Sequence, residues 1–220
     1  MSNTNTMDLK KRGLEMKWFF DAKAAESYDD VHAAFAPSKV MLTDALPDDV
    51  RNVLDLGTGT GLELFRFFER FPDARVTALD ISPNMLAQLS KRPFADRVDI
   101  IIGDFFETDF GLPEGIGYDA VISTSALHHF LEEDKVRLFR KVYECLKPGG
   151  IFVNSDYYAA DQASQDASLE WYLENPEMRP HGDTPLTIEN EIRALKAAGF
   201  TDITSEPAGN ARYMLVKAKK

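Results

Sequence analysis

The chain has 220 residues, of which 44% are hydrophobic and 28% charged, as in an ordinary globular protein that buries a full core. Its formal net charge of −11 repels polyanions, so neither nucleic acid nor an anionic membrane surface is expected as a partner. Cys145 is the single cysteine, which excludes an internal disulfide, and residues 1–9 are too polar for a secretory signal. We expect a cytoplasmic protein of one domain, residues 1–220, without a membrane span, either monomer or homodimer.

The predicted elements fall into two groups along the chain. Apolar residues between Leu14 and Leu46 recur at helical spacing and predict one or two helices. From residue 52, short apolar runs alternate with amphipathic segments, which is typical of βα units on a parallel sheet. Strands are expected at 52–56, 75–80, 98–103, 119–124, 150–155, 200–205 and 213–217, the last two as an antiparallel hairpin at the sheet edge.

Helices fit between most of these strands. Their boundaries carry capping or breaking residues: Ser82 and Pro83 at one start, Pro148 and Gly149 at one end, and Thr187 and Gly199 around the last helix. Residues 157–185 are expected to be irregular.

The sharpest motif is the stretch 53–61, Val-Leu-Asp-Leu-Gly-Thr-Gly-Thr-Gly, in which a strand runs into a glycine turn and then a helix. A dinucleotide fingerprint, G-x-G-x-x-G, would place its last glycine at Leu62, so a dehydrogenase that binds NAD is disfavoured. Asp55 precedes the first glycine and would repel a phosphate, so the ligand is expected to be cationic at this end.

With this motif the chain resembles the class I S-adenosylmethionine-dependent methyltransferases, from about residue 14 to the C-terminus. The resemblance implies an α/β fold, a three-layer Rossmann-like sandwich with a seven-stranded, mostly parallel sheet. Residues 1–46 would be an N-terminal helical lid, 47–220 the Rossmann-like core, and 157–185 an insert on the acceptor side. It also implies that S-adenosylmethionine is the cofactor and S-adenosylhomocysteine the product.

The same resemblance assigns roles around the cofactor. Asp80 ends the second strand, where a carboxylate can accept two hydrogen bonds from ribose hydroxyls. Asp104 and Phe105, after the third strand, resemble the adenine site. The full set of expected cofactor residues is Tyr28, Asp55, Gly57, Thr58, Gly59, Gly61, Asp80, Ile81, Met85, Asp104, Phe105 and Ser123.

Two adjacent histidines, His128 and His129, follow the fourth strand. An imidazole titrates near neutral pH, so either can be a general base for an acceptor, and either can instead cap or pack at the following helix. Aromatic residues that could shape the acceptor site, or simply pack in the core, are Trp18, Phe19, Phe20, Tyr28, Tyr157, Tyr158, Trp171 and Tyr172, with His181 beside them.

The sequence lacks the motifs of several other classes of enzyme and of metal sites. There is no Asn/Asp-Pro-Pro-aromatic motif like that of base-amine methyltransferases, no acidic cluster like that of divalent-metal catechol methyltransferases, and no Cys/His set with metal spacing. We expect no metal and a small-molecule acceptor with an oxygen, nitrogen or carbon nucleophile. The alternatives are a protein that binds S-adenosylmethionine without transferring the methyl group, and a methyltransferase acting on protein or RNA.

Overall fold

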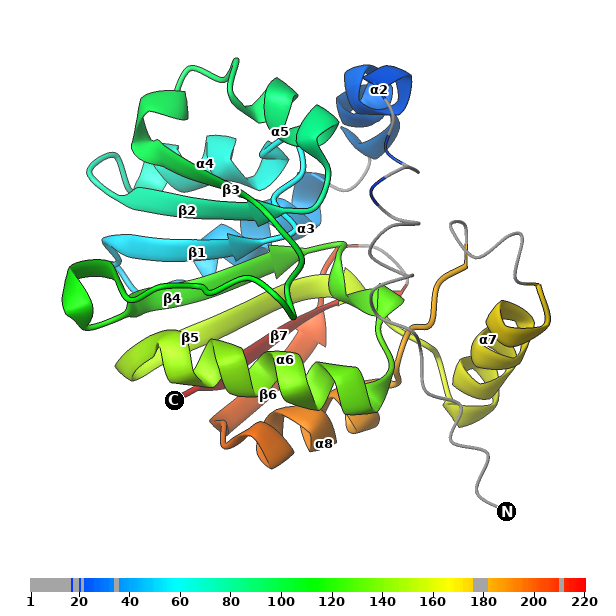
Figure 1. Ribbon diagram of the computed structural model, residues 1–220. Coiled ribbons are helices and arrows are strands. Elements are labelled where there is room, and N and C mark those ends of the chain that lie inside the picture. Colours follow the sequence, from blue (N-terminus) through cyan, green and yellow to red (C-terminus); the bar gives the residue numbers. More distant parts are fainter. Residues whose placement is uncertain (1–16, 18–19, 21, 34–35, 176–181, 210–211) are drawn as a thin grey trace.

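A computed structural model describes residues 17, 20, 22–33, 36–175, 182–209 and 212–220 of the chain (Figure 1). It contains a seven-stranded sheet in the order β3-β2-β1-β4-β5-β7-β6. The strands are β1 (Asn52–Leu56), β2 (Arg75–Asp80), β3 (Val98–Ile102), β4 (Tyr118–Thr124), β5 (Leu146–Tyr157), β6 (Thr201–Pro207) and β7 (Tyr213–Lys219). All seven strands expected from the sequence are present.

The pairing of the strands confirms a mostly parallel sheet. The first five strands run parallel, while β7 is antiparallel to both β5 and β6, so the two last strands form the expected hairpin. The strand β5 begins at Leu146, earlier than expected, because Leu146 already pairs with Tyr118. The preceding helix therefore ends at Cys145, three residues before Pro148. Pro148 disfavours helical geometry at Lys147, so the helix could not have continued up to the proline.

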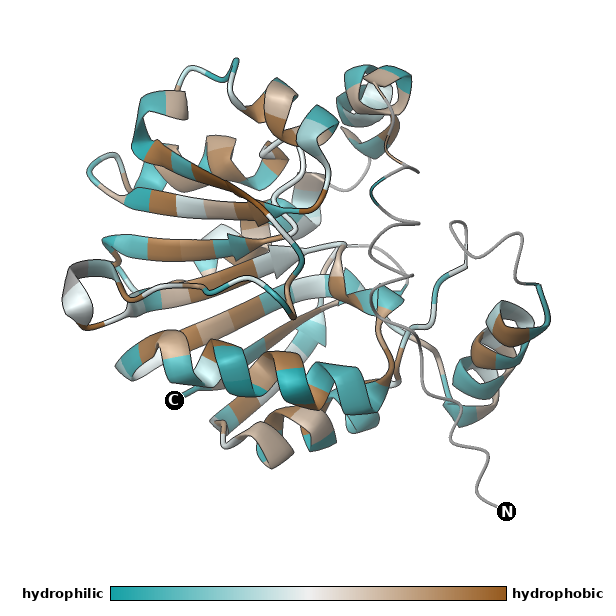
Figure 2. Cartoon of the chain, viewed as in Figure 1, coloured by the Kyte–Doolittle hydropathy of each residue, from teal (hydrophilic) through white to brown (hydrophobic). Residues whose placement is uncertain are grey.

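Helices cover both faces of the sheet, which makes the predicted three layers. The helices are α2 (Ala22–His32), α3 (Ala36–Asp44), α4 (Leu62–Arg70), α5 (Pro83–Leu89), α6 (Glu132–Cys145), α7 (Gln162–Glu174) and α8 (Ile188–Ala198). Helices α3, α4 and α5 pack on one face, and α6 and α8 pack on the other. Neighbouring residues of β1, Val53 and Leu54, point to opposite cores. Figure 2 shows the apolar strands between these layers and the polar outer side of α6.

The expected helix caps are confirmed. The Ser82 hydroxyl accepts a hydrogen bond from the N–H of Met85, and Pro83 takes the first helical position of α5. The Thr187 hydroxyl accepts from the N–H of Asn190 at the start of α8, and Gly199 ends that helix with a φ of 108°.

The segment 157–185 differs from the prediction, because it contains the helix α7 rather than irregular chain alone. Asp161 caps α7 by accepting a hydrogen bond from the N–H of Ser164 at 2.8 Å. Tyr172 is the buried residue that α7 contributes, so this helix has no apolar stripe to reveal it in the sequence. Figure 1 shows α7 beyond the carboxyl ends of β1 and β4.

Within the described residues, no helix has the length and apolar character needed to cross a bilayer. The expected helical positions Leu14, Trp18 and Phe19, and the candidate His181, lie outside the described residues.

Candidate functional site

The glycine turn between β1 and α4 lies at the carboxyl end of the sheet. Gly57, Gly59 and Gly61 have φ angles of 76°, 55° and 74°, values that a side chain makes costly. A Cβ at Gly57 would lie 2.4 Å from the Cβ of Ala126, and a Cβ at Gly61 would lie 2.5 Å from Leu89 Cδ1. The turn therefore needs glycines, both for its backbone conformation and for its close packing against Ala126 and Leu89.

Asp80, at the end of β2, holds this turn against the start of α5. Its Oδ2 accepts a hydrogen bond from the N–H of Gly59 at 2.8 Å, and its Oδ1 accepts one from the N–H of Ser82 at 2.8 Å. Burial raises the pKa of the Asp80 carboxyl to about 6, although the two N–H donors oppose that rise.

A pocket opens beside this turn, where open α/β sheets bind ligands. Seven of the expected cofactor residues line it: Tyr28, Gly57, Gly59, Asp80, Ile81, Met85 and Phe105. The other five, Asp55, Thr58, Gly61, Asp104 and Ser123, are not among its lining residues. Phe20 and His129, expected on the acceptor side, also line the pocket, together with Ser125, Ala126 and Phe130.

Ser125 was not singled out from the sequence, because its role depends on backbone geometry. It has a φ of 53°, a rare value for a residue other than glycine and one that concentrates at functional sites. Its hydroxyl lies 3.1 Å from the Tyr213 hydroxyl on β7. No sequence pattern marks such a backbone angle, although Ser125, like Ala126 and Phe130, lies in the stretch that contains the two histidines.

Asp55 lies beneath the turn and is fully buried. Neither of its carboxyl oxygens has a hydrogen-bond partner among the described residues. Burial, together with the neighbouring Glu63 carboxyl, raises the pKa of Asp55 well above its usual range. Lys39, which no sequence motif marks, donates to Glu63 Oε2 at 3.0 Å and to Thr124 Oγ1 at 3.0 Å. This buried cluster holds two carboxyls beside a single lysine.

Tyr28 brings α2 over the pocket. Its ring stacks on His32 at a centroid distance of 3.8 Å and meets Phe20 edge to face at 6.0 Å. Burial raises the pKa of the Tyr28 phenol, so the hydroxyl stays neutral at physiological pH. Among the described N-terminal residues, Tyr28 on α2 and Phe20 before it line the pocket.

The two histidines have different surroundings. His128 Nδ1 lies 2.6 Å from Asp156 Oδ1 at the end of β5, and its Nε2 lies 3.5 Å from Asp183 Oδ1. Burial disfavours the charged imidazole, but Asp156 and Asp183 outweigh it and raise the pKa of His128 to about 9. His128 therefore carries a proton at neutral pH in this arrangement, while His129 is the histidine that lines the pocket.

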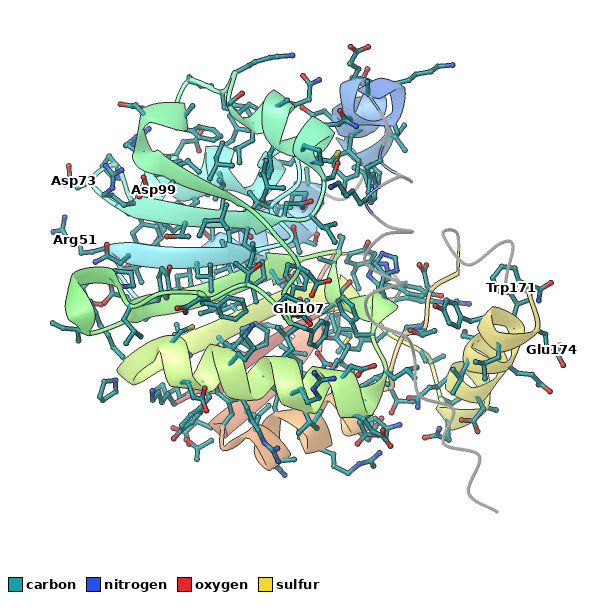
Figure 3. The ribbon with its side chains drawn as sticks, in the orientation of Figure 1. Arg51, Asp73, Asp99, Glu107, Trp171 and Glu174 are labelled. Carbon is teal, nitrogen blue, oxygen red and sulfur yellow. The ribbon has the colours of Figure 1, made fainter. Side chains whose placement is uncertain are left out.

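A second hollow adjoins α7, lined by Tyr157, Ala167, Ser168, Trp171, Gly182, Asp183 and Pro185. Figure 3 places Trp171 and Glu174 on α7, at the opposite end of the molecule from Arg51 and Asp99. Asp183 Oδ1 lies 3.3 Å from His129 Nδ1, so this aspartate connects the second hollow to the first pocket. Tyr158 and Tyr172, by contrast, are buried in the core.

Comparison with known proteins agrees with this geometry. A family model described as a methyltransferase domain matches residues 53–150. The chain is 30% identical over 167 residues to an uncharacterized methyltransferase of Bacillus cytotoxicus, with 72% of this chain and 74% of that protein covered. It is 27% identical over 170 residues to a phosphoethanolamine N-methyltransferase of Plasmodium falciparum, covering 77% of this chain and 60% of that protein.

Solved structures share the fold. The mitomycin 7-O-methyltransferase MmcR superposes with a TM-score of 0.71 at 21% identity, covering 98% of this chain and 61% of that chain. The chain spans about half to three fifths of the length of several curated relatives that it matches. The strand order, the glycine turn and the relative with 30% identity all indicate the same family. The chain belongs to the class I S-adenosylmethionine-dependent methyltransferases.

Proposed function

We propose that the chain binds S-adenosylmethionine in the pocket beside the glycine turn and transfers its methyl group to a small-molecule acceptor. One observation carries the proposal: the ends of β1, β2 and β4 and the segment after β3 bring Gly57, Asp80, Ala126 and Phe105 to a single pocket wall. These are the strand ends at which the family resemblance expects the methionine, ribose and adenine parts of the cofactor.

The residues fit such a ligand chemically. Gly57 and Gly59 offer backbone rather than side chain to the pocket, so a bulky group can approach closely. Asp80 supplies a carboxylate for ribose hydroxyls, while Ile81, Met85 and Phe105 supply apolar surface for a purine. The Asp55 carboxyl lies buried below the turn without a hydrogen-bond partner among the described residues, on the side where the cofactor's ammonium would lie. Burial and Glu63 favour its neutral form in the free protein, and an ammonium group nearby would favour the carboxylate.

S-adenosylmethionine, when bound, supplies an electrophilic methyl carbon on a sulfonium. The protein then has to align an acceptor in line with that carbon and exclude water. Tyr28 and Phe20 cover the pocket from the N-terminal side, and His129 and Phe130 close it from the side of β4. The acceptor proton leaves to solvent or to a pocket base, and His129 is placed for that role while His128 is held by Asp156 and Asp183.

A small molecule suits the acceptor side best. The net charge of −11 disfavours RNA, and a second hollow beside Trp171 and Tyr157 lies close to the cofactor pocket, since its Asp183 contacts His129 of that pocket. The alternatives are a protein acceptor and cofactor binding without methyl transfer. A methyl-transfer assay over small hydroxyl and amine compounds distinguishes both from this proposal.

Cofactor binding is tested by calorimetry with S-adenosylmethionine, S-adenosylhomocysteine and NAD. Exchange of Asp80 for alanine is expected to weaken binding of the adenosyl compounds by about 1 to 3 kcal/mol, or roughly 5- to 140-fold, through the lost hydrogen bonds. The control is Asp99→Ala, because Asp99 is an exposed carboxylate on β3 that pairs with Arg75 at 3.1 Å. Binding of NAD without the adenosyl compounds, or equal affinities in both variants, would contradict the proposal.

Binding is also expected to depend on pH through Asp80. Its pKa of about 6 in the free protein means that the carboxyl takes up a proton as the pH falls through that value. A neutral carboxyl accepts hydrogen bonds less well, so affinity should fall below pH 6 towards that of Asp80→Ala. Calorimetry between pH 5 and roughly pH 7.5 measures this loss of affinity. If the affinity of Asp80→Ala fell by the same factor over this range, the pH dependence would belong to another group.

A further inference from the structure

His128, His129 and Asp183 form a cluster at the wall of the cofactor pocket. The two histidines lie in the short 3-10 turn Leu127–His129 after β4, and Asp183 lies in the chain that leads into α8. One ligand atom from each of the three lies within 4.8 Å of the others. Sequence spacing could not reveal this set, because Asp183 reaches the histidines only through the fold.

The two distances from Asp183 to the histidines match those between ligands of one metal ion. Asp183 Oδ1 lies 3.5 Å from His128 Nε2 and 3.3 Å from His129 Nδ1. Zinc binds nitrogen and carboxylate oxygen at about 2.0 to 2.2 Å in tetrahedral geometry, which places neighbouring ligand atoms about 3.3 to 3.5 Å apart. The ligand atoms of the two histidines lie within 4.8 Å of one another, and side-chain rotation would bring them to the spacing that an ion requires.

Asp156 and Thr184 hold the ligands of the cluster in position by hydrogen bonds, as residues next to the ligands do at metal sites with histidine. Asp156 Oδ1 lies 2.6 Å from His128 Nδ1, which leaves Nε2 on the side of Asp183. Asp156 Oδ2 accepts from the N–H groups of Leu127 and His128, and so fixes the turn itself. The Thr184 N–H donates to the His128 carbonyl at 3.0 Å and holds the Asp183 segment in place.

The charges of the cluster also favour a cation. Asp156 is fully buried, and Asp183 lies next to the histidines, so two carboxylates share this region. A divalent ion on His128 Nε2 would displace the proton of that nitrogen to solvent and balance both carboxylates in its place, while the Nδ1–H stays to donate to Asp156.

We propose that His128, His129 and Asp183 bind one divalent transition-metal ion of the Zn²⁺ or Fe²⁺ class. Three protein ligands leave a coordination position open, as in catalytic rather than structural sites. His129 lines the cofactor pocket, so that position is available to an oxygen of the acceptor. A His129 that binds the ion through Nδ1 keeps its proton on Nε2, so in the metal-loaded protein the ion takes over activation of the acceptor from His129 as base. This role for the ion rests on the proposed function, whereas the binding of the ion does not.

The test uses the full chain without an affinity tag, stripped with chelator and titrated calorimetrically with Zn²⁺. We expect one Zn²⁺ per chain, with affinity reduced at least about tenfold in Asp183→Ala and in His129→Ala. Glu174→Ala is the matched control, since Glu174 is an exposed carboxylate on α7 and should leave Zn²⁺ binding unchanged. Unfolding curves of each variant show whether it remains folded.

A second readout is the visible spectrum of the Co²⁺-loaded chain, which should show tetrahedral bands that Asp183→Ala lacks. Equal Zn²⁺ binding by the wild type, Asp183→Ala and Glu174→Ala would overturn the proposal, as would absence of stoichiometric binding by the wild type. S-adenosylmethionine binding in the presence of chelator is measured separately. If it persists while Zn²⁺ fails to bind, only the metal site is refuted; if Zn²⁺ binds and the cofactor does not, only the proposed function is refuted.

Discussion

Replacing Gly57 with alanine is expected to abolish measurable S-adenosylmethionine binding and to lower the free energy of unfolding by more than about 2 kcal/mol. The φ of 76° at Gly57 is costly for any side chain, and the new Cβ would meet the Ala126 Cβ at 2.4 Å. Relief of that contact requires the turn or the segment after β4 to move, and both line the pocket. Calorimetry and urea unfolding measure the two effects.

Gly149→Ala separates the backbone cost from the loss of space. Gly149 has a φ of 79°, close to that of Gly57, but nothing lies within 4 Å of a Cβ built there. It should lose about 1 to 2 kcal/mol of stability and bind the cofactor normally. Equal losses of stability and of binding in both variants would show that the approach of Ala126 to Gly57 is unimportant.

The fold was predictable because its strongest signals are local. Each strand between Asn52 and Thr124 is a short apolar run, and the glycine turn and the Ser82 cap mark where the following helices begin. Helix α7 was not predictable in this way, because it buries Tyr172 alone and therefore shows no apolar periodicity. A helix that packs through so little of its surface leaves only its cap, Asp161, as a signal.

The residues of the candidate site also differ in how far the sequence could reveal them. Asp80 ends β2 and Phe105 lies just beyond the end of β3, so the order of strands along the sequence was enough to place both at the pocket. Ser125 depends on an unusual backbone angle, and the contacts of Asp183 with the histidines depend on the path of the chain after α7. Lys39 was missed for a different reason, since a lysine in a surface helix is normally solvated and its pairing with Glu63 becomes visible only after folding.

The largest loss of stability from a side chain remote from the cofactor is expected for Lys135→Met, at about 3 to 5 kcal/mol. Lys135 on α6 and Glu191 on α8 are 1% and 0% exposed, and their charged atoms lie 2.6 Å apart. Loss of the lysine would leave the carboxylate of Glu191 buried without its cation, near the Tyr158 hydroxyl at 3.2 Å. Urea unfolding followed by circular dichroism measures the change.

The double variant Lys135→Met, Glu191→Gln tests whether the unpaired charge, and not lost packing, causes this cost. Glutamine keeps an oxygen for the Tyr158 hydroxyl but carries no charge, so most of the lost stability should return. Arg193→Met removes the cation of the exposed Arg193–Glu132 pair between the same two helices and should change stability little, because solvent screens that pair. If Lys135→Met cost no more than Arg193→Met, the buried pair would not be what holds α6 against α8.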